Sequence, residues 1–243
     1  MITFDIEVLC TAARRVLKVW QHLVRRPRHH RLAACSARAT VPGFLLLLPL
    51  SALAQNLTLT GDATFTAVSG YAGGNETRGA TDGSRGITAI TWYEDGDEPC
   101  KLVLDTKDFN TRDINNPQVV LKDVYTHTGK QPCSSPGNRK AVRLAGTDNW
   151  IYKIQTCTTD KRNTSNNKLK GIRIWAATVN QRSPLSVSRG SSFQEAKHTH
   201  CSKWRTAVAC PQGKIASRLR VHHNGSKTKA IGLALECRTL SPG

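Results

Sequence analysis

The sequence predicts an all-β fold, built as a single domain of three similar strand-rich units. One short pattern occurs three times: a small residue, then a branched aliphatic residue, with an apolar or aromatic residue two or three positions further on. The copies are Gly86–Trp92, Leu169–Trp175 and Ala230–Glu236. Repeated units of this kind pack into one domain, because a single unit cannot bury its own apolar face.

Alternation of apolar and polar residues marks further strands in residues 55–243. It occurs at Leu57–Thr60, Phe65–Val68, Ile151–Thr156 and Leu219–Val221. Runs rich in glycine, proline, asparagine and aspartate separate these segments and indicate turns. Helical periodicity over ten or more residues occurs only near the N-terminus, so the rest of the chain favours strands.

The three units are expected at about 57–110, 119–180 and 187–240. In units two and three an earlier strand precedes the repeated one, at Trp150–Cys157 and Lys214–His222. The glycine-rich stretch Ser69–Gly86 takes that place in unit one. Two closures suit three such units: a β-prism with pseudo-threefold symmetry, or a β-trefoil-like barrel. A two-sheet sandwich is the third alternative.

The N-terminal part of the chain has the features of an export signal. An apolar run, Val41–Ala54, follows an arginine-rich segment and ends in the small-x-small sequence Ala52-Leu53-Ala54. This order is typical of a secretory signal peptide, and the run is shorter than the ~20 residues of a transmembrane helix. We expect residues 1–54 to be a basic extension plus signal peptide, cleaved near Ala54. Residues 55–243 are then a secreted or periplasmic β domain with no transmembrane segment.

The expected mature chain is strongly basic. The whole chain has 35 basic and 17 acidic residues, and residues 1–54 hold eight and two of them, which leaves 27 and 15 and a net charge of +12. In an exported protein such a charge favours anionic partners, such as acidic glycans or another anionic polymer at a cell surface. Nucleic-acid binding would need aromatic residues interleaved with the basic ones, and only Trp204 fits, so no specific nucleic-acid partner is expected.

The cysteine count agrees with export. Six cysteines lie in residues 55–243, and an even number in an exported chain indicates disulfides, with 15 connectivities open. Cys210 and Cys237 flank the two strands of unit three and are candidates to bridge their ends. Cys100 and Cys133 would close the excursion between units one and two. The remaining candidates are Cys157 and Cys201.

Two glycines of the repeat, Gly171 and Gly232, are expected where their strands pack closely on a neighbouring segment. A β-carbon at either position would overpack the contact, at a cost of ~1–3 kcal/mol.

The segment Cys201–Cys237 is more specific than the rest. It contains Trp204, the turn Cys210-Pro211-Gln212-Gly213, a strand, a polar loop, and a second strand with small apolar residues that ends at Cys237. This order resembles the vitelline membrane outer layer protein family, and the match extends faintly to Trp150, Cys157 and Gly171. The resemblance implies a secreted, disulfide-bonded β-prism of three Greek-key sheets, related in shape to jacalin-type lectins.

The sequence offers few residues for chemistry. His198 and His200 are weak metal candidates, because two histidines two apart on an extended segment point the same way. A paired-carboxylate site would suit a glycoside hydrolase, and Glu94, Asp95, Asp97 and Glu98 are clustered at a turn. No serine-nucleophile signature is found in the sequence, and we expect no cofactor and no resident metal.

Unit three carries the best candidate binding residues. Alternation places Leu219 and Val221 on the inner face of their strand and Arg218 and Arg220 on the outer face, in solvent. Lys227 and Lys229 follow in the next loop, and Trp204 is the nearby aromatic residue. The sequence thus favours a secreted, non-enzymatic protein that binds glycans or another anionic extracellular surface. The alternatives are an exported glycoside hydrolase acting on wall or matrix sugar, and a structural envelope protein.

Overall fold

The computed structural model describes most of the chain from Asn56 onwards. The described ranges are 56–73, 75–80, 83–95, 98–121, 138–161, 166–181, 184–224 and 229–243. The chain divides into two units between Ser51 and Ala52, and all described residues belong to the second. The predicted signal peptide in residues 1–54 lies outside them. The described ranges contain fourteen β-strands and no α-helix, which confirms the predicted all-β class.

The strands form three antiparallel sheets. Sheet A holds, in spatial order, β1 (Leu57–Phe65), β14 (Ala230–Pro242), β13 (Lys214–His223) and β3 (Asn75–Ala80), with the short β2 (Ser69–Gly70) also paired to β14. Sheet B holds β6 (Ile114–Leu121), β5 (Glu98–Asp108), β4 (Arg85–Asp95) and β7 (Asn138–Arg143). Sheet C holds β10 (Ser186–Lys197), β9 (Leu169–Asn180), β8 (Asn149–Thr158) and β11 (Lys203–Trp204), with β12 (Val208–Ala209) also paired to β8.

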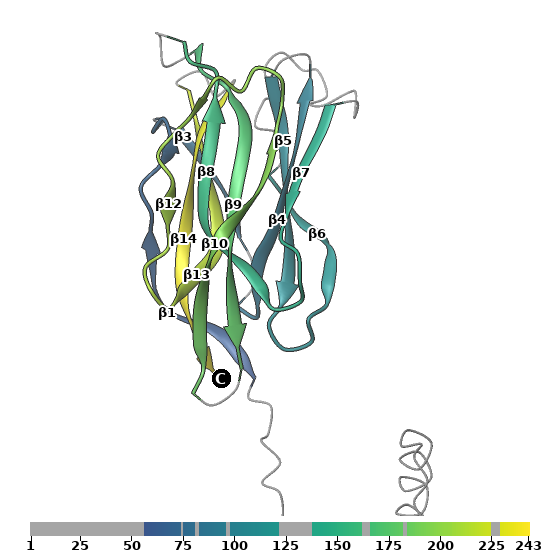
Figure 1. The fold of residues 1–243 in the computed structure, drawn as a ribbon, viewed down its shortest axis with the longest axis vertical. Helices are drawn as coiled ribbons and strands as arrows, with labels where there is room; N and C mark the ends of the chain where they lie inside the picture. Colours follow the sequence, from purple (N-terminus) through teal and green to yellow (C-terminus); the bar gives the residue numbers. More distant parts are fainter. Residues whose placement is uncertain are drawn as a thin grey trace, which may run out of the picture. The chain divides into compact units, whose positions relative to one another are not determined.

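Each sheet has the same strand order. In sheets B and C the four strands, numbered along the chain, lie in the spatial order fourth, first, second, third, which is a Greek key. Sheet A has the same arrangement when the count starts at the hairpin β13–β14, with β1 and β3, from the N-terminal part of the domain, as the third and fourth strands. Figure 1 shows sheet B forming one side of the domain. Three Greek-key sheets around one core make a β-prism, as predicted.

Matching irregularities in strand pairing support the threefold relation. One extra residue bulges from the first strand of each sheet at the same level: Thr88, Tyr152 and Ser217. The burial patterns of β8 and β13 are identical along their lengths. The third strand of each sheet also has a three-residue irregularity, at 116–118, 190–192 and 61–63. Bulges are conserved design features of sheets, so three matched sets indicate one repeated unit.

The three sheets share one apolar core, which contains two of the largest buried side chains, Trp92 from β4 and Trp150 from β8. Leu219 and Leu235 join the same core from sheet A, and Ile174 from sheet C. Because every sheet contributes to it, no sheet is expected to be stable alone.

The structure corrects how the sequence divided the first unit. The repeat at Gly86–Trp92 lies on β4, the first strand of its hairpin, whereas the other two copies lie on second strands, β9 and β14. The stretch Ser69–Gly86, expected to precede the repeat within unit one, contains β2 and β3 of sheet A. Hydrophobic spacing could not separate first from second strands, because both face the core.

Several expected contacts are present. Cys210 and Cys237 are bonded, as predicted, and Cys157 is bonded to Cys201. The pairing proposed for Cys100 and Cys133 lies outside the residues and side chains described. A β-carbon on Gly232 would lie 2.5 Å from the carbonyl oxygen of Tyr71, and one on Gly171 would lie 3.0 Å from side-chain atoms and 3.2 Å from Trp204. Both glycines therefore occupy the close approaches expected.

Candidate ligand-binding face of sheet A

The alternation predicted for β13 is confirmed. Leu219 and Val221 are fully buried in the core, and Arg218 and Arg220 project from the opposite face of sheet A. The strands on either side of β13 add charged residues to this outer face. Arg220 lies opposite Arg78 on β3, and Arg218 lies opposite Glu236 on β14.

Four arginines share two carboxylates on this face. Glu236 is almost completely buried, and Arg218 and Arg238 each approach one of its oxygens at 3.5 Å. Glu76 binds Arg78 at 2.5 Å and also Arg220. The hydrogen bond from Arg78 is the main cause that lowers the pKa of Glu76, with Arg220 contributing. Each carboxylate is paired with two of the four arginines, so the face has an excess of two positive charges.

An exposed aromatic ring lies beside the arginines. Phe65, at the end of β1, is 46% exposed, and its centroid lies 4.7 Å from the Arg220 guanidinium and 5.8 Å from that of Arg78. Guanidinium groups stack favourably on aromatic faces, so the ring helps to hold both side chains in place. We call Phe65, Arg78, Arg218, Arg220 and Arg238 the sheet A face.

The structure changes the role expected for Arg220. Its side chain is only 18% exposed, because Glu76 and Phe65 cover it, whereas those of Arg218 and Arg78 are 37% and 49% exposed. The prediction that both arginines of β13 face solvent thus holds for Arg218, but it is wrong for Arg220, because most of that side chain is covered. Arg78, Arg218 and Arg238 are the cations with guanidinium surface available to a ligand.

Of the other predicted binding residues, Trp204 does not join this face. Trp204 lies on sheet C, where Arg173 stacks on its ring at 3.8 Å. Lys229 begins the approach to β14, and its backbone N–H donates to Asn224 Oδ1 at 3.1 Å. Lys227 lies outside the described residues. The sequence placed these residues together because they are close along the chain, but Trp204 and Arg218 belong to different sheets.

The two weak metal candidates differ in their surroundings. His198 follows β10 and packs edge-on against Trp92, with Nδ1 3.6 Å from Glu94 Oε2, while His200 is exposed in a turn. The expected extended segment with both rings on one side is not formed, because the strand ends at Lys197. Among the residues described, no cluster of three or more histidine, cysteine or acidic side chains could hold a metal ion.

Of the carboxylates considered for hydrolysis, Glu94 has structural contacts, and so have two further carboxylates of β5, Asp105 and Asp108. Glu94 accepts two hydrogen bonds from the buried Lys170 ammonium, at 3.0 and 3.1 Å. Asp105 pairs with Arg143. Asp108 accepts backbone N–H groups of Asn110 and Thr111, which close the turn after β5. Each of these carboxylates therefore has a structural role.

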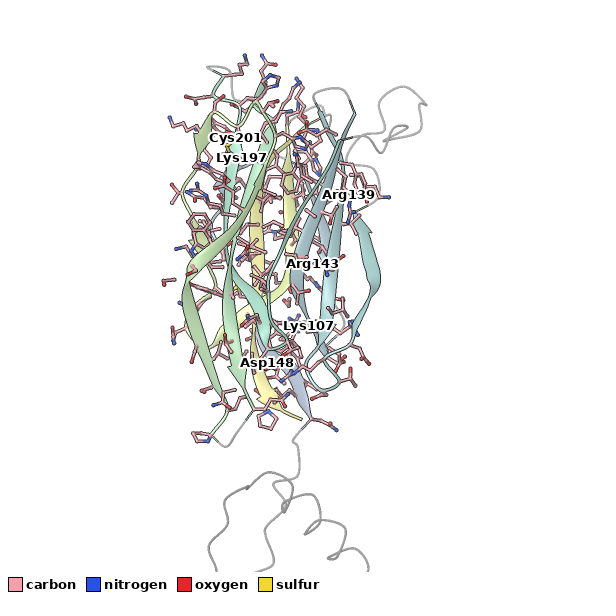
Figure 2. The ribbon with its side chains drawn as sticks, turned by 45° about the vertical axis from the view of Figure 1, so that its right-hand side comes forward. Lys107, Arg139, Arg143, Asp148, Lys197 and Cys201 are labelled. Atoms are coloured by element: carbon pink, nitrogen blue, oxygen red, sulfur yellow. A yellow bond between two sulfur atoms is a disulfide. The ribbon has the colours of Figure 1, made fainter. Side chains whose placement is uncertain are left out.

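A second set of cations lies along β7, the edge strand of sheet B. Arg139, Lys140 and Arg143 are exposed there, and Figure 2 shows Arg139 and Arg143 along this strand. Arg143 pairs with Asp105, whereas no ion pair joins Arg139 or Lys140 to another described side chain. Charged side chains on an edge strand discourage pairing with other chains, and Tyr93, which is only partly exposed, lies opposite Arg139 in the pairing of β4 with β7.

Sequence reasoning missed three of the five residues of the sheet A face. Phe65, Arg78 and Arg238 were not singled out, because they are distant in sequence from Arg218 and meet it only when β1, β3, β13 and β14 pair. One signal was available: Glu236 interrupts an apolar strand, and a buried carboxylate needs cations nearby.

Comparisons with known proteins give structural likeness at low identity. No family model and no curated protein matches the chain. The Calsepa lectin, solved with a biantennary N-glycan, is 14% identical, with a TM-score of 0.46 over 74% of this chain and 99% of that chain. Single-chain recombinant jacalin is 11% identical, with a TM-score of 0.44 over 74% and 96%. A mannose-specific jacalin-related lectin from Morus nigra, solved with mannose, is 10% identical, with a TM-score of 0.42 over 74% and 96%.

The fold assignment rests on the strand order itself. The three Greek-key sheets that the family resemblance implied are present, while membership of the vitelline membrane outer layer family stays a prediction. In the ranges that the structure describes, no helix has the length and apolar character to cross a membrane.

Proposed function

We propose that this protein is a secreted, non-enzymatic binding protein that recognises an anionic glycan through the sheet A face. The observation that carries the proposal is the gathering of four arginines on one face of sheet A, two of them over an exposed phenylalanine ring, with two carboxylates, one of which is buried. Guanidinium groups bind carboxylate and sulfate oxygens in a bidentate manner, and an exposed ring offers an apolar surface to the C–H groups of a pyranose.

Secretion is the setting that suits this ligand. Two disulfides join β8 to the segment after β10 and the start of the β13 hairpin to β14, and such bonds persist in oxidising compartments. The predicted signal peptide would deliver residues 55–243 there. The chain would then meet acidic polysaccharides of cell surfaces or matrices.

The test compares two variants that each lose two positive charges. Arg78→Gln with Arg218→Gln removes the two most exposed guanidinium groups of the sheet A face. Arg139→Gln with Lys140→Gln, on β7, is the matched control. Retention on immobilised heparin is measured in a salt gradient. Salt screens exposed charge contacts, over ~8 Å at physiological ionic strength, so a face with fewer arginines releases heparin at lower salt. We therefore expect the sheet A variant to elute at clearly lower salt than both the control and the wild type.

Equal shifts in the two variants would show that only net charge matters and would contradict a defined face. No retention of the wild-type protein on heparin or on polyuronate would contradict the proposal as a whole and favour a structural envelope protein. Circular dichroism checks that both variants stay folded.

A further inference from the structure

We propose that the outer face of sheet C is a second site for the same anionic glycan, so that one molecule binds a glycan chain at two places. The inference rests on the function proposed for the sheet A face and extends it to a surface that the sequence did not identify. Three lines of structure carry it: equivalent position, an exposed ring, and an excess of positive charge.

The pseudo-threefold relation places Phe193 where sheet A has Phe65. Phe193 pairs with Trp175 of β9, and Phe65 pairs with Glu236 of β14. Trp175 and Glu236 are themselves equivalent. Each pairs with the residue of the first strand that comes directly after the one-residue bulge. The two phenylalanines are 45% and 46% exposed, and with Ile114 they are the exposed large apolar residues in the part of the chain described.

The backbone around Phe193 is held in place by hydrogen bonds from aromatic side chains. Residues 190–192 leave the regular pairing of β10 with β9. The indole N–H of Trp175 donates to the carbonyl of Ser191 at 3.0 Å, and the Tyr152 hydroxyl donates to the carbonyl of Gly190 at 2.9 Å. Bulges that re-aim a side chain are frequent near binding sites, and this one directs an apolar ring to solvent.

Cations contact the aromatic rings of this face, as they contact Phe65 on sheet A. The guanidinium of Arg173 lies 4.6 Å from the centroid of Phe193 and 3.8 Å from that of Trp204, so it is stacked between two rings. The ammonium of Lys153 lies 4.3 Å from the centroid of Trp175. We call Phe193, Trp175, Arg173, Lys153 and Lys197 the sheet C face.

One carboxylate, Glu195, binds two of the three cations of this face. Glu195 binds Arg173 at 2.6 Å and Lys197 at 3.2 Å. Burial raises the pKa of Glu195, but the hydrogen bonds and charges of these two cations, with Arg173 foremost, outweigh it, so the pKa lies below its usual value and the carboxylate stays ionised at neutral pH. The excess is again two positive charges, the same as on sheet A. Lys197 is 55% exposed and lies toward one end of the face, as Figure 2 shows.

The chemistry that fits is a sugar chain with sulfate or carboxylate groups. The exposed side of Phe193 packs on pyranose C–H groups, and the ammonium groups of Lys153 and Lys197 attract the anionic substituents. Because the two faces belong to different sheets, a short oligosaccharide fills one face at a time, whereas a long chain can contact both and gains apparent affinity through effective concentration.

The experiment uses the secreted chain and a size-defined heparin tetrasaccharide in isothermal titration calorimetry. We expect two tetrasaccharides per wild-type molecule. Phe193→Ala with Lys197→Gln should leave one, which remains sensitive to Arg218→Gln, and Phe65→Ala with Arg218→Gln should leave the other. The β7 pair Arg139→Gln with Lys140→Gln should keep both. If Phe193→Ala fails to fold, Lys153→Gln with Lys197→Gln replaces it and should also leave one site.

The outcomes separate the two proposals. One tetrasaccharide per molecule, lost with the sheet A variant and unaffected by the sheet C variant, overturns the second site and leaves the proposed function standing. Binding that depends on the sheet C variant alone overturns the sheet A proposal and keeps this face as a site. Absence of binding to the wild-type chain overturns both.

Discussion

Replacing one partner of the buried Glu94–Lys170 ion pair should destabilise the domain more than any change on its surface. The pair joins β4 of sheet B to β9 of sheet C, and the lysine side chain is completely buried, with the carboxylate 4% exposed. Lys170→Met would leave the Glu94 carboxylate beside the Trp92 and His198 rings without its nearest cation. A buried charge that loses its partner cannot recover its hydration.

The size of the effect follows from that missing compensation. Removing one member of a buried pair typically costs ~3–5 kcal/mol, against a total stability of about 5–15 kcal/mol for a domain. Replacing both members with apolar residues of similar volume is often neutral or stabilising by ~1–4 kcal/mol. We expect Lys170→Met and Glu94→Leu each to be strongly destabilising, and the double variant to be close to the wild type.

Urea denaturation at pH 7, followed by tryptophan fluorescence and far-UV circular dichroism, measures the free energy of unfolding of the four proteins. The coupling energy is the departure of the double variant from the sum of the two single ones. Single variants that each lose less than about 1 kcal/mol, or losses that simply add, would refute the reasoning, because the pair would then be solvated or dispensable.

Three further predictions concern packing, pH and the disulfides. Gly232→Val should cost ~1–3 kcal/mol because its β-carbon would meet a backbone oxygen at 2.5 Å, whereas Gly83→Ala, with open space around it, should change the melting temperature little; equal effects would contradict the close approach. Burial lowers the pKa of His222 in the folded state, so the stabilising contribution of this residue is present above the unfolded pKa of ~6.5 and is lost as pH falls through the folded pKa. His222→Gln should therefore make the free energy of unfolding depend less on pH between pH 7 and 5. Replacing Cys210 and Cys237 by serine opens a loop of 27 residues and should cost ~3–4 kcal/mol, and an unchanged urea midpoint would show that the bond does not constrain the unfolded chain.

Local sequence patterns predicted the parts of the fold that depend on neighbouring residues. Alternation fixed which side of β13 enters the core, and flanking positions predicted the bond between Cys210 and Cys237. The small residues at Gly171 and Gly232 marked close approaches, because only a missing side chain leaves space there. The alternation and the disulfide depend on one strand or one hairpin, whereas Gly232 meets a distant segment at Tyr71, which the sequence did not identify.

Such local patterns could not predict contacts between segments that are distant in the sequence. The pairing of β3 with β13 brings Arg78 beside Arg220, and it depends on which sheet each strand joins. The buried Glu94–Lys170 pair likewise looked like a turn carboxylate and a strand lysine, since nothing within either segment indicates the other. The candidate site was therefore found on β13 and missed on β1 and β3.

The pairing of β1 with β14 has a consequence for how the chain is made. Leu57 lies opposite Pro242, and the N–H of Gly243 donates to the carbonyl of Asn56 at 2.6 Å. During synthesis β1 emerges before β14, whose paired residues lie about 180 residues further along the chain. Sheet A can close only after translation has reached the end of β14, so the nascent chain lacks a complete prism until then. Folding of this domain is therefore limited by contacts between segments that are far apart in the sequence, and such contacts form slowly.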